Sequence, residues 1–151
     1  MNKYFVILLI VLGFSACTPE NHYERAIRFK NSNWIKFNEL KYDIPLEAGK
    51  SYSYDAILIV DSTYHQRKIK LGFYLEFPSG ETRLLDKTVR LLDNEFQSLG
   101  EKTDVGYQYE IAFRKHLKTN ETGILKAEVV LHSQYYDNYG IIGFDLFVKE
   151  D

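Results

Sequence analysis

Histidine side chains bind metals and transfer protons near neutral pH, so they are the first candidates for a chemical site. The chain has four of them, His22, His65, His116 and His132, and no two share the short spacing of a zinc-binding pair. It also lacks the Gly-x-Ser-x-Gly elbow of serine hydrolases and a Gly-rich phosphate-binding loop. The sequence therefore predicts solvated histidines, and it predicts no catalytic residue, metal site or cofactor.

Paired carboxylates are the second chemistry to consider, because glycosidases use two facing acids at a defined separation. Several aspartates fall at expected turns, and no spacing among them motivates a particular pair. A hydrolase with dispersed carboxylates is thus an alternative, and the expectation is a protein that is not an enzyme. The aspartates in question are Asp61, Asp86, Asp93, Asp104, Asp137 and Asp145.

A tyrosine-rich stretch is the strongest candidate for a binding contact. It runs Tyr135, Tyr136, Asp137, Asn138, Tyr139, between two expected strands. Exposed tyrosines offer a flat apolar face with a hydroxyl at the tip, which suits protein or sugar surfaces. The alternative is that these rings close the end of the hydrophobic core.

Cys17 is the only cysteine, so it has no disulfide partner within the chain. It follows Lys3, an apolar run from Tyr4 to Phe14, and the small residues Ser15 and Ala16, which is the layout of a secretory signal. The apolar run is far shorter than the roughly 20 residues of a spanning helix. This arrangement resembles the lipobox of bacterial lipoproteins, in which the cysteine is acylated, whereas the alternative is an ordinary cleaved signal with a free thiol.

The prediction is a signal peptide over 1–16, a lipid-anchored tether over 17–24 and one domain over 25–151. Of the 19 basic residues only Lys3 lies in 1–16, which leaves 18 against 21 acidic residues. A balance this mild favours neither nucleic acid nor an anionic membrane surface as a partner. The expected membrane partner is the lipid bilayer, which the protein would bind through the acyl chains on Cys17.

The domain is expected to be all-β, because tyrosines and phenylalanines are frequent and apolar residues alternate with polar ones. Seven or eight antiparallel strands would stack as a two-sheet β-sandwich. Strands 52–60 and 68–77 are predicted to be antiparallel neighbours, and Pro45 indicates an edge position or a strand end. The expected strands are 34–37, 42–46, 52–60, 68–77, 81–93, 106–113, 125–131 and 142–148.

Short motifs over nearly the whole mature chain resemble gliding-motility-associated lipoproteins of the GldH type from Bacteroidetes. They include Cys17, Trp34 with Phe37, the Gly49-x-x-Tyr52 turn, and segments 71–78, 91–93 and 139–144. The chain departs from the resemblance at Asp93-Asn94-Glu95-Phe96, where an Asp-x-x-Gly-x-Trp-type segment is usual. The resemblance implies a non-enzymatic lipoprotein that assists surface motility or the associated secretion machinery.

The functional expectation is an outer-membrane lipoprotein, facing the periplasm, that serves as an interaction or scaffold module for an envelope protein partner. The alternative expectation is a glycan-binding surface lipoprotein that uses the tyrosine-rich stretch.

Overall fold

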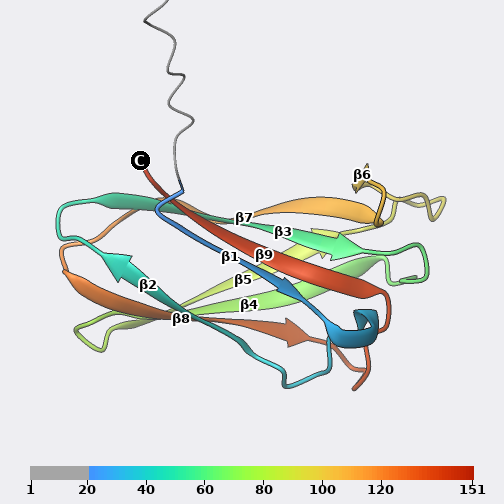
Figure 1. The fold of residues 1–151 in the computed structure, drawn as a ribbon, viewed down its shortest axis with the longest axis horizontal. Helices are drawn as coiled ribbons and strands as arrows, with labels where there is room; N and C mark the ends of the chain where they lie inside the picture. Colours follow the sequence, from blue (N-terminus) through green and yellow to red (C-terminus); the bar gives the residue numbers. More distant parts are fainter. Residues whose placement is uncertain (1–20) are drawn as a thin grey trace, which may run out of the picture.

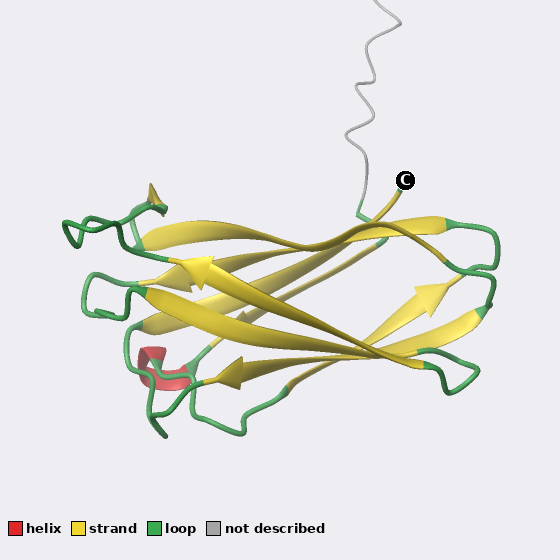
Figure 2. Ribbon diagram, turned by 180° about the vertical axis from the view of Figure 1, so that it is seen from behind, coloured by secondary structure: helices red, strands yellow, loops and turns green. Residues whose placement is uncertain are grey.

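The computed structural model describes residues 21–151, which form two antiparallel β-sheets packed face to face (Figures 1 and 2). One sheet has five strands in the order β1-β9-β3-β7-β6, and the other has four in the order β2-β8-β4-β5. The expected all-β, two-sheet sandwich is therefore confirmed. In chain order the elements are β1 (Tyr23–Arg28), the 3-10 turn η2 (Lys30–Ser32), β2 (Leu40–Leu46), β3 (Ser51–Val60), β4 (Lys68–Glu76), β5 (Thr82–Arg90), β6 (Glu101–Lys102), β7 (Tyr107–Lys118), β8 (Gly123–His132) and β9 (Ile141–Glu150).

Alternation of apolar and polar residues gives the sheets a buried face, most regularly in β2. In β2, Leu40, Tyr42, Ile44 and Leu46 are buried while the residues between them are exposed. Successive side chains of a strand point to opposite faces, so one face of each sheet is apolar and faces the other sheet. Aromatic rings fill the space between the sheets, and Phe73 lies 4.6 Å from Phe113 between ring centroids.

The position of Pro45 agrees with its chemistry. β2 is an edge strand of the four-stranded sheet, and Pro45 lies one residue from the end of β2. Proline has no N–H to donate to a ladder, so an edge strand tolerates it.

The predicted pairing of 52–60 with 68–77 is wrong. β3 pairs with β7 and β9, whereas β4 pairs with β5 and β8 in the other sheet. Both strands show the same alternation because both bury one face in the same core. Alternation identifies the buried face of a strand and says nothing about which sheet carries it.

The predicted strand at 34–37 is also wrong, because this segment forms a turn after an isolated bridge at Asn33. Phe37 has φ of 70°, in the left-handed region that strands exclude. Trp34 is fully buried, stacks on Phe29 at 4.8 Å, and donates its indole N–H to the carbonyl oxygen of Asn38 at 2.8 Å. The apolar character of the segment thus reflects one buried indole.

Residues 21–151 contain nine strands where seven or eight are predicted, because β1 and β6 are strands that the sequence pattern does not indicate, and β7 is longer than predicted. β7 continues to Lys118, beyond the expected end at 113. Near that expected end its register against β3 shifts around Arg114, and His116 has φ of 51°. Such bulges break the two-residue period that reveals a strand. β1 begins at Tyr23, so the expected domain boundary near residue 25 falls inside a strand, and only Tyr23 and Ile27 of β1 pack on the core.

The sandwich is elongated, with its strands running roughly along the long axis (Figure 1). Tyr23, the first residue of β1, lies opposite Val148 near the end of β9, and these residues mark one end of the sandwich, which we call the tether end. Loops 29–39, 61–67, 91–106 and 133–140 lie at the opposite end, which we call the distal end. Loops 47–50, 77–81 and 119–122 belong to the tether end.

Candidate functional site

Cys17 and the signal segment 1–16 lie outside the described residues, so lipidation stays a prediction. The tyrosine-rich stretch, in contrast, is fully described and lies at the distal end between β8 and β9. It is therefore the part of the predicted site whose geometry can be examined.

The three tyrosines of this stretch point to solvent and do not close the core. Tyr135 is 48% exposed, and Tyr136 and Tyr139 are each 62% exposed. The buried member is Asn138, which is 4% exposed. Aromatic rings left in water on a folded domain are available for contact with another molecule.

Asn138 holds the loop in place through both ends of its amide. Its Nδ2 donates to the carbonyl oxygen of Trp34 at 3.0 Å, and its Oδ1 accepts from the hydroxyl of Ser133 at 2.6 Å. Its backbone N–H donates to Oδ1 of Asn33 at 2.8 Å, and Asn33 in turn donates from Nδ2 to Asp137 at 2.7 Å. Asn138 and Asp137 are thus positioning residues for the tyrosines.

Two exposed phenylalanines at the distal end are not part of the predicted site. Phe37 is 74% exposed with φ of 70°, and Phe96 is 63% exposed with φ of 61°. The left-handed region is unfavourable for bulky residues, which makes both positions strained. No pattern in the sequence identifies this backbone conformation. For Phe96 the only signal is its place in the loop where the resemblance has an aromatic residue.

The distal loops contact one another in a row. The backbone N–H of Lys36 donates to the carbonyl oxygen of Tyr136 at 2.7 Å, which joins loops 29–39 and 133–140. The N–H of Asp61 donates to the carbonyl oxygen of Gly140 at 2.8 Å, which joins loops 133–140 and 61–67. Gly140 has φ of 94°, and a Cβ there would come within 2.9 Å of Oδ1 of Asp61, so only glycine allows this approach.

The row continues from loop 61–67 to loop 91–106. Arg67 Nη2 donates to the carbonyl oxygen of Asn94 at 2.9 Å, and the guanidinium lies 4.2 Å from the centroid of the Phe96 ring. A cation over an aromatic face is a favourable contact. Tyr64, in the same loop, is largely buried, and this burial raises its pKa to about 12.

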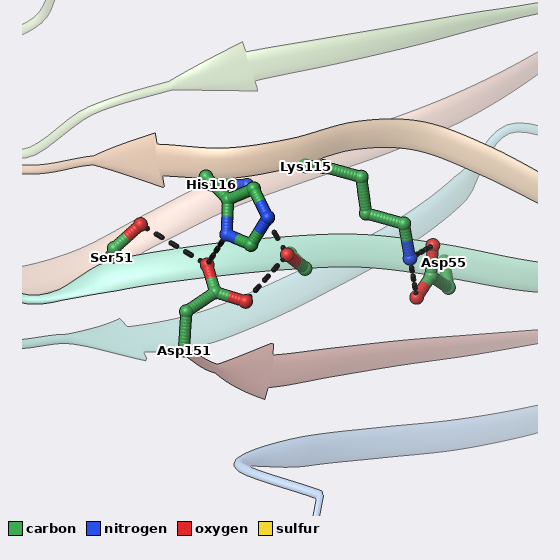
Figure 3. A network of polar contacts seen from close by, with 6 residues as sticks. Ser51, Asp55, Lys115, His116 and Asp151 are labelled. Carbon is green, nitrogen blue, oxygen red and sulfur yellow. Dashed lines mark hydrogen bonds and ion pairs between the residues drawn. The ribbon is translucent and has the colours of Figure 1, made fainter.

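A serine, histidine and aspartate group at the tether end deserves comparison with a catalytic triad (Figure 3). Ser51 and Ser53 donate their hydroxyls directly to Asp151, at 3.1 and 2.7 Å, and His116 Nδ1 lies 3.1 Å from the same carboxylate. The Ser53 hydroxyl further accepts a hydrogen bond from the backbone N–H of His116. In a triad the imidazole stands between hydroxyl and carboxylate, whereas here the carboxylate accepts from both, so no hydroxyl is activated as a nucleophile.

This group fixes Asp151, the residue that follows β9. The hydrogen bond from Ser53 is the main reason that the pKa of Asp151 lies below its usual value of 3.8, with Ser51 and His116 adding to the effect and desolvation opposing it. Next to it, Lys115 Nζ contacts Asp55 at 2.5 Å (Figure 3). The remaining histidines are dispersed, and His22 contacts the carbonyl oxygen of Pro45 at 2.6 Å.

Across the part of the chain that the structure describes, no cluster of three or more His, Cys, Asp or Glu side chains could hold a metal ion. Within residues 21–151, no helix has the length and apolar character needed to cross a bilayer.

Comparison with known proteins finds no matching protein-family model and no matching curated protein. Solved structures of infectious bursal disease virus, strains Gt and Gx, match 87% of this chain with 14% and 12% sequence identity. The TM-scores are 0.32 and 0.28, and the chain spans about a third of those viral chains, 34% and 31%. Scores this low carry no inference about this chain.

Proposed function

We propose that this chain is a membrane-anchored, non-enzymatic interaction module of a cell-envelope complex, and that its distal end binds a protein partner. The observation that carries the proposal is the gathering of exposed aromatic side chains on loops opposite the tether end. These side chains are Phe37, Phe96, Tyr135, Tyr136 and Tyr139.

The reach of the tether supports a distal contact. Four residue steps separate Cys17 from Asn21, so this segment spans at most roughly 14 Å. β9 has 10 residues, which correspond to about 34 Å along the sandwich. With its long axis normal to the bilayer, the domain would hold its distal loops well away from the membrane, where a partner can approach them.

The composition of the distal end supports a macromolecular contact. Tyrosine and phenylalanine bury large areas at a low cost in side-chain entropy and are enriched in binding hot spots. Asn138 holds the tyrosine loop rigidly, so little freedom is lost when a partner binds. Exposed aromatic side chains on a rigid loop are the features expected of such a surface.

The cellular setting of the proposal comes from the sequence. The signal segment and Cys17 support an outer-membrane lipoprotein, which we place on the periplasmic face. The resemblance to gliding-motility-associated lipoproteins supports a partner in the motility or secretion machinery.

Site-specific photo-crosslinking of the full-length lipoprotein in its own cells tests the proposal. A photoreactive residue at position 37 or 136 should crosslink to the same envelope protein, identified by mass. Matched probes at Ala48 and Asn120, exposed at the tether end, should not capture it. Equal capture from both ends, or no common product from positions 37 and 136, would refute a distal binding surface. Cys17→Ser should release the protein to the soluble fraction, and retention in the membrane would refute the anchor.

A glycan is the second candidate for the distal end, because the exposed rings of Tyr135, Tyr136 and Tyr139 are suited to stack on sugars. A glycan array probed with residues 21–151 should then show binding that Tyr136→Ala removes. If the wild-type domain binds no glycan, this candidate is abandoned.

A further inference from the structure

A hollow of about 500 Å³ with polar and apolar lining residues lies at the distal end, between loop 61–67 and the start of β4 on one side and the end of β8 on the other. Ile69 and Leu131, which are 3% and 4% exposed, contribute apolar residues to its lining. Its volume falls within the range of sites that bind small molecules.

The side chains that line the hollow are basic or neutral. Arg67 and Lys68 carry positive charges, and His65 and His132 add imidazoles. None of the lining residues, all of which belong to the described chain, is acidic. The carboxylate of Asp86 approaches His132 from outside, at 3.8 Å, and also contacts Lys70 at 3.3 Å, so it is shared with a cation that does not line the hollow. The hollow is therefore complementary to a negative charge.

The rest of the lining offers stacking and hydrogen bonding. Tyr135 presents a half-exposed ring at the edge of the hollow, and Gln66 and Gln134 are exposed amides that both donate and accept hydrogen bonds. A sugar ring has an apolar face for the tyrosine and hydroxyls for the amides. A phosphate or sulfate ion would use the cations alone.

The loop that carries Tyr135 is held in position. The Ser133 hydroxyl accepts from the backbone N–H of Tyr135 at 3.1 Å while it donates to Asn138. Arg67 is fixed by its contacts with Asn94 and Phe96. A preformed wall on each side lowers the entropic cost of binding a small ligand.

We propose that this hollow binds an anionic saccharide, in which Lys68 holds a carboxylate, Arg67 adds positive charge at the rim and a sugar ring stacks on Tyr135. This site does not require the protein partner proposed above, because of the five exposed aromatic residues of that surface only Tyr135 lines the hollow.

Binding of defined oligosaccharides to residues 21–151 tests the proposal, since these residues contain the complete sandwich. The probes are a galacturonate oligomer, a neutral galactose oligomer of the same length and a glutamate peptide, each titrated by calorimetry. The galacturonate oligomer should bind about tenfold more tightly than the neutral one, as expected for the loss of a charge-assisted hydrogen bond. Lys68→Gln should weaken galacturonate binding by about tenfold, and Tyr135→Ala should weaken both sugars.

Lys126→Gln is the matched control, because Lys126 is an exposed lysine of β8 outside the hollow, and it should leave binding unchanged. Equal binding of acidic and neutral sugars would overturn the role of charge. Binding of the glutamate peptide as tightly as galacturonate would assign the hollow to acidic peptides instead, and failure of all three probes to bind would overturn the site. None of these outcomes affects crosslinking from positions 37 and 136, which tests the protein partner separately.

Discussion

The side-chain amide of Asn138 donates a hydrogen bond to the backbone carbonyl oxygen of Trp34, across more than one hundred positions of sequence. The bond ties the tyrosine loop to the segment that follows β1. Asn138 is one of three buried polar residues of the described chain, with Ser53 and Thr119.

Asn138→Leu should lower the free energy of unfolding by about 1–3 kcal/mol, because the Trp34 carbonyl and the Ser133 hydroxyl lose their partner. Urea unfolding followed by the fluorescence of Trp34, the sole tryptophan, measures this change. Asn120→Ala, at an exposed position, serves as the control. An unchanged urea midpoint for Asn138→Leu would mean that the loop is held by other contacts.

Tyr42 and Tyr52 form a matched pair for testing a buried hydroxyl. The Tyr42 hydroxyl is buried without a hydrogen-bond partner among the described residues, whereas the Tyr52 hydroxyl accepts from the N–H of Glu47 at 3.0 Å. Tyr52→Phe should destabilise the fold by about 1 kcal/mol, and Tyr42→Phe should be neutral or stabilising. Thermal unfolding of both variants checks the contrast, and a larger loss for Tyr42→Phe would indicate a partner for its hydroxyl.

Phe37→Asn should stabilise the isolated domain by about 0.5–1 kcal/mol, because asparagine tolerates positive φ and little ring burial is lost. Phe37→Ala removes the same ring but tolerates positive φ less well than asparagine, so its gain should be smaller. Chemical denaturation compares the three proteins. If Ala and Asn behave alike, backbone strain at this position has no energetic consequence. Loss of the position-136 crosslink in the more stable Asn variant would link the strain to partner binding.

Acidification should weaken the fold partly through Asp151. Its pKa is lowered in the folded state, so its stabilising contribution is present above pH 3.8 and is lost as the pH falls through the folded value. The stability difference between wild type and Asp151→Asn should therefore shrink at acidic pH. Urea midpoints measured across the acidic range test this, and a constant difference would exclude Asp151 as the titrating group.

Alkali should weaken the fold through buried tyrosines. Burial raises the pKa of Tyr64 to about 12 and raises that of Tyr42 and Tyr54 further. Their contribution is complete below pH 10.0, the usual value, and is lost as the pH rises through the folded values. Ultraviolet absorbance should show phenolate formation by these residues coinciding with unfolding, and Tyr64→Phe should reduce the alkaline loss.

The fold class follows from the sequence because the alternation of β4, from Ile69 to Phe77, reports burial on one face directly. The pairing partner of each strand does not follow from the sequence, since β3 and β4 lie in different sheets although both bury side chains in the same core. β7 was truncated in the prediction because the bulge near His116 interrupts its period. Local pattern therefore specifies which face is buried, while pairing depends on long-range contacts.

The candidate site was predictable only in part. The composition of 135–139 predicts a binding loop, and the exposure of its tyrosines excludes the alternative that they close the core. The burial of Asn138 depends on Asn33 and Trp34, which no local pattern connects to it. The left-handed backbone of Phe37 could not be predicted from the sequence either, because phenylalanine rarely adopts that conformation.

β1 follows the tether directly and pairs with β9 over six residues, from Tyr23 opposite Val148 to Arg28 opposite Gly143. Arg25 and His22 also bond to carbonyl oxygens of β2, and Arg28 pairs with Asp145. A pull between the bilayer and a partner at the distal end would run along β1, so these bonds would resist it together in shear instead of peeling one at a time. If the proposed anchor and partner exist, β1 would pass such a force to β9 along all six of its paired residues.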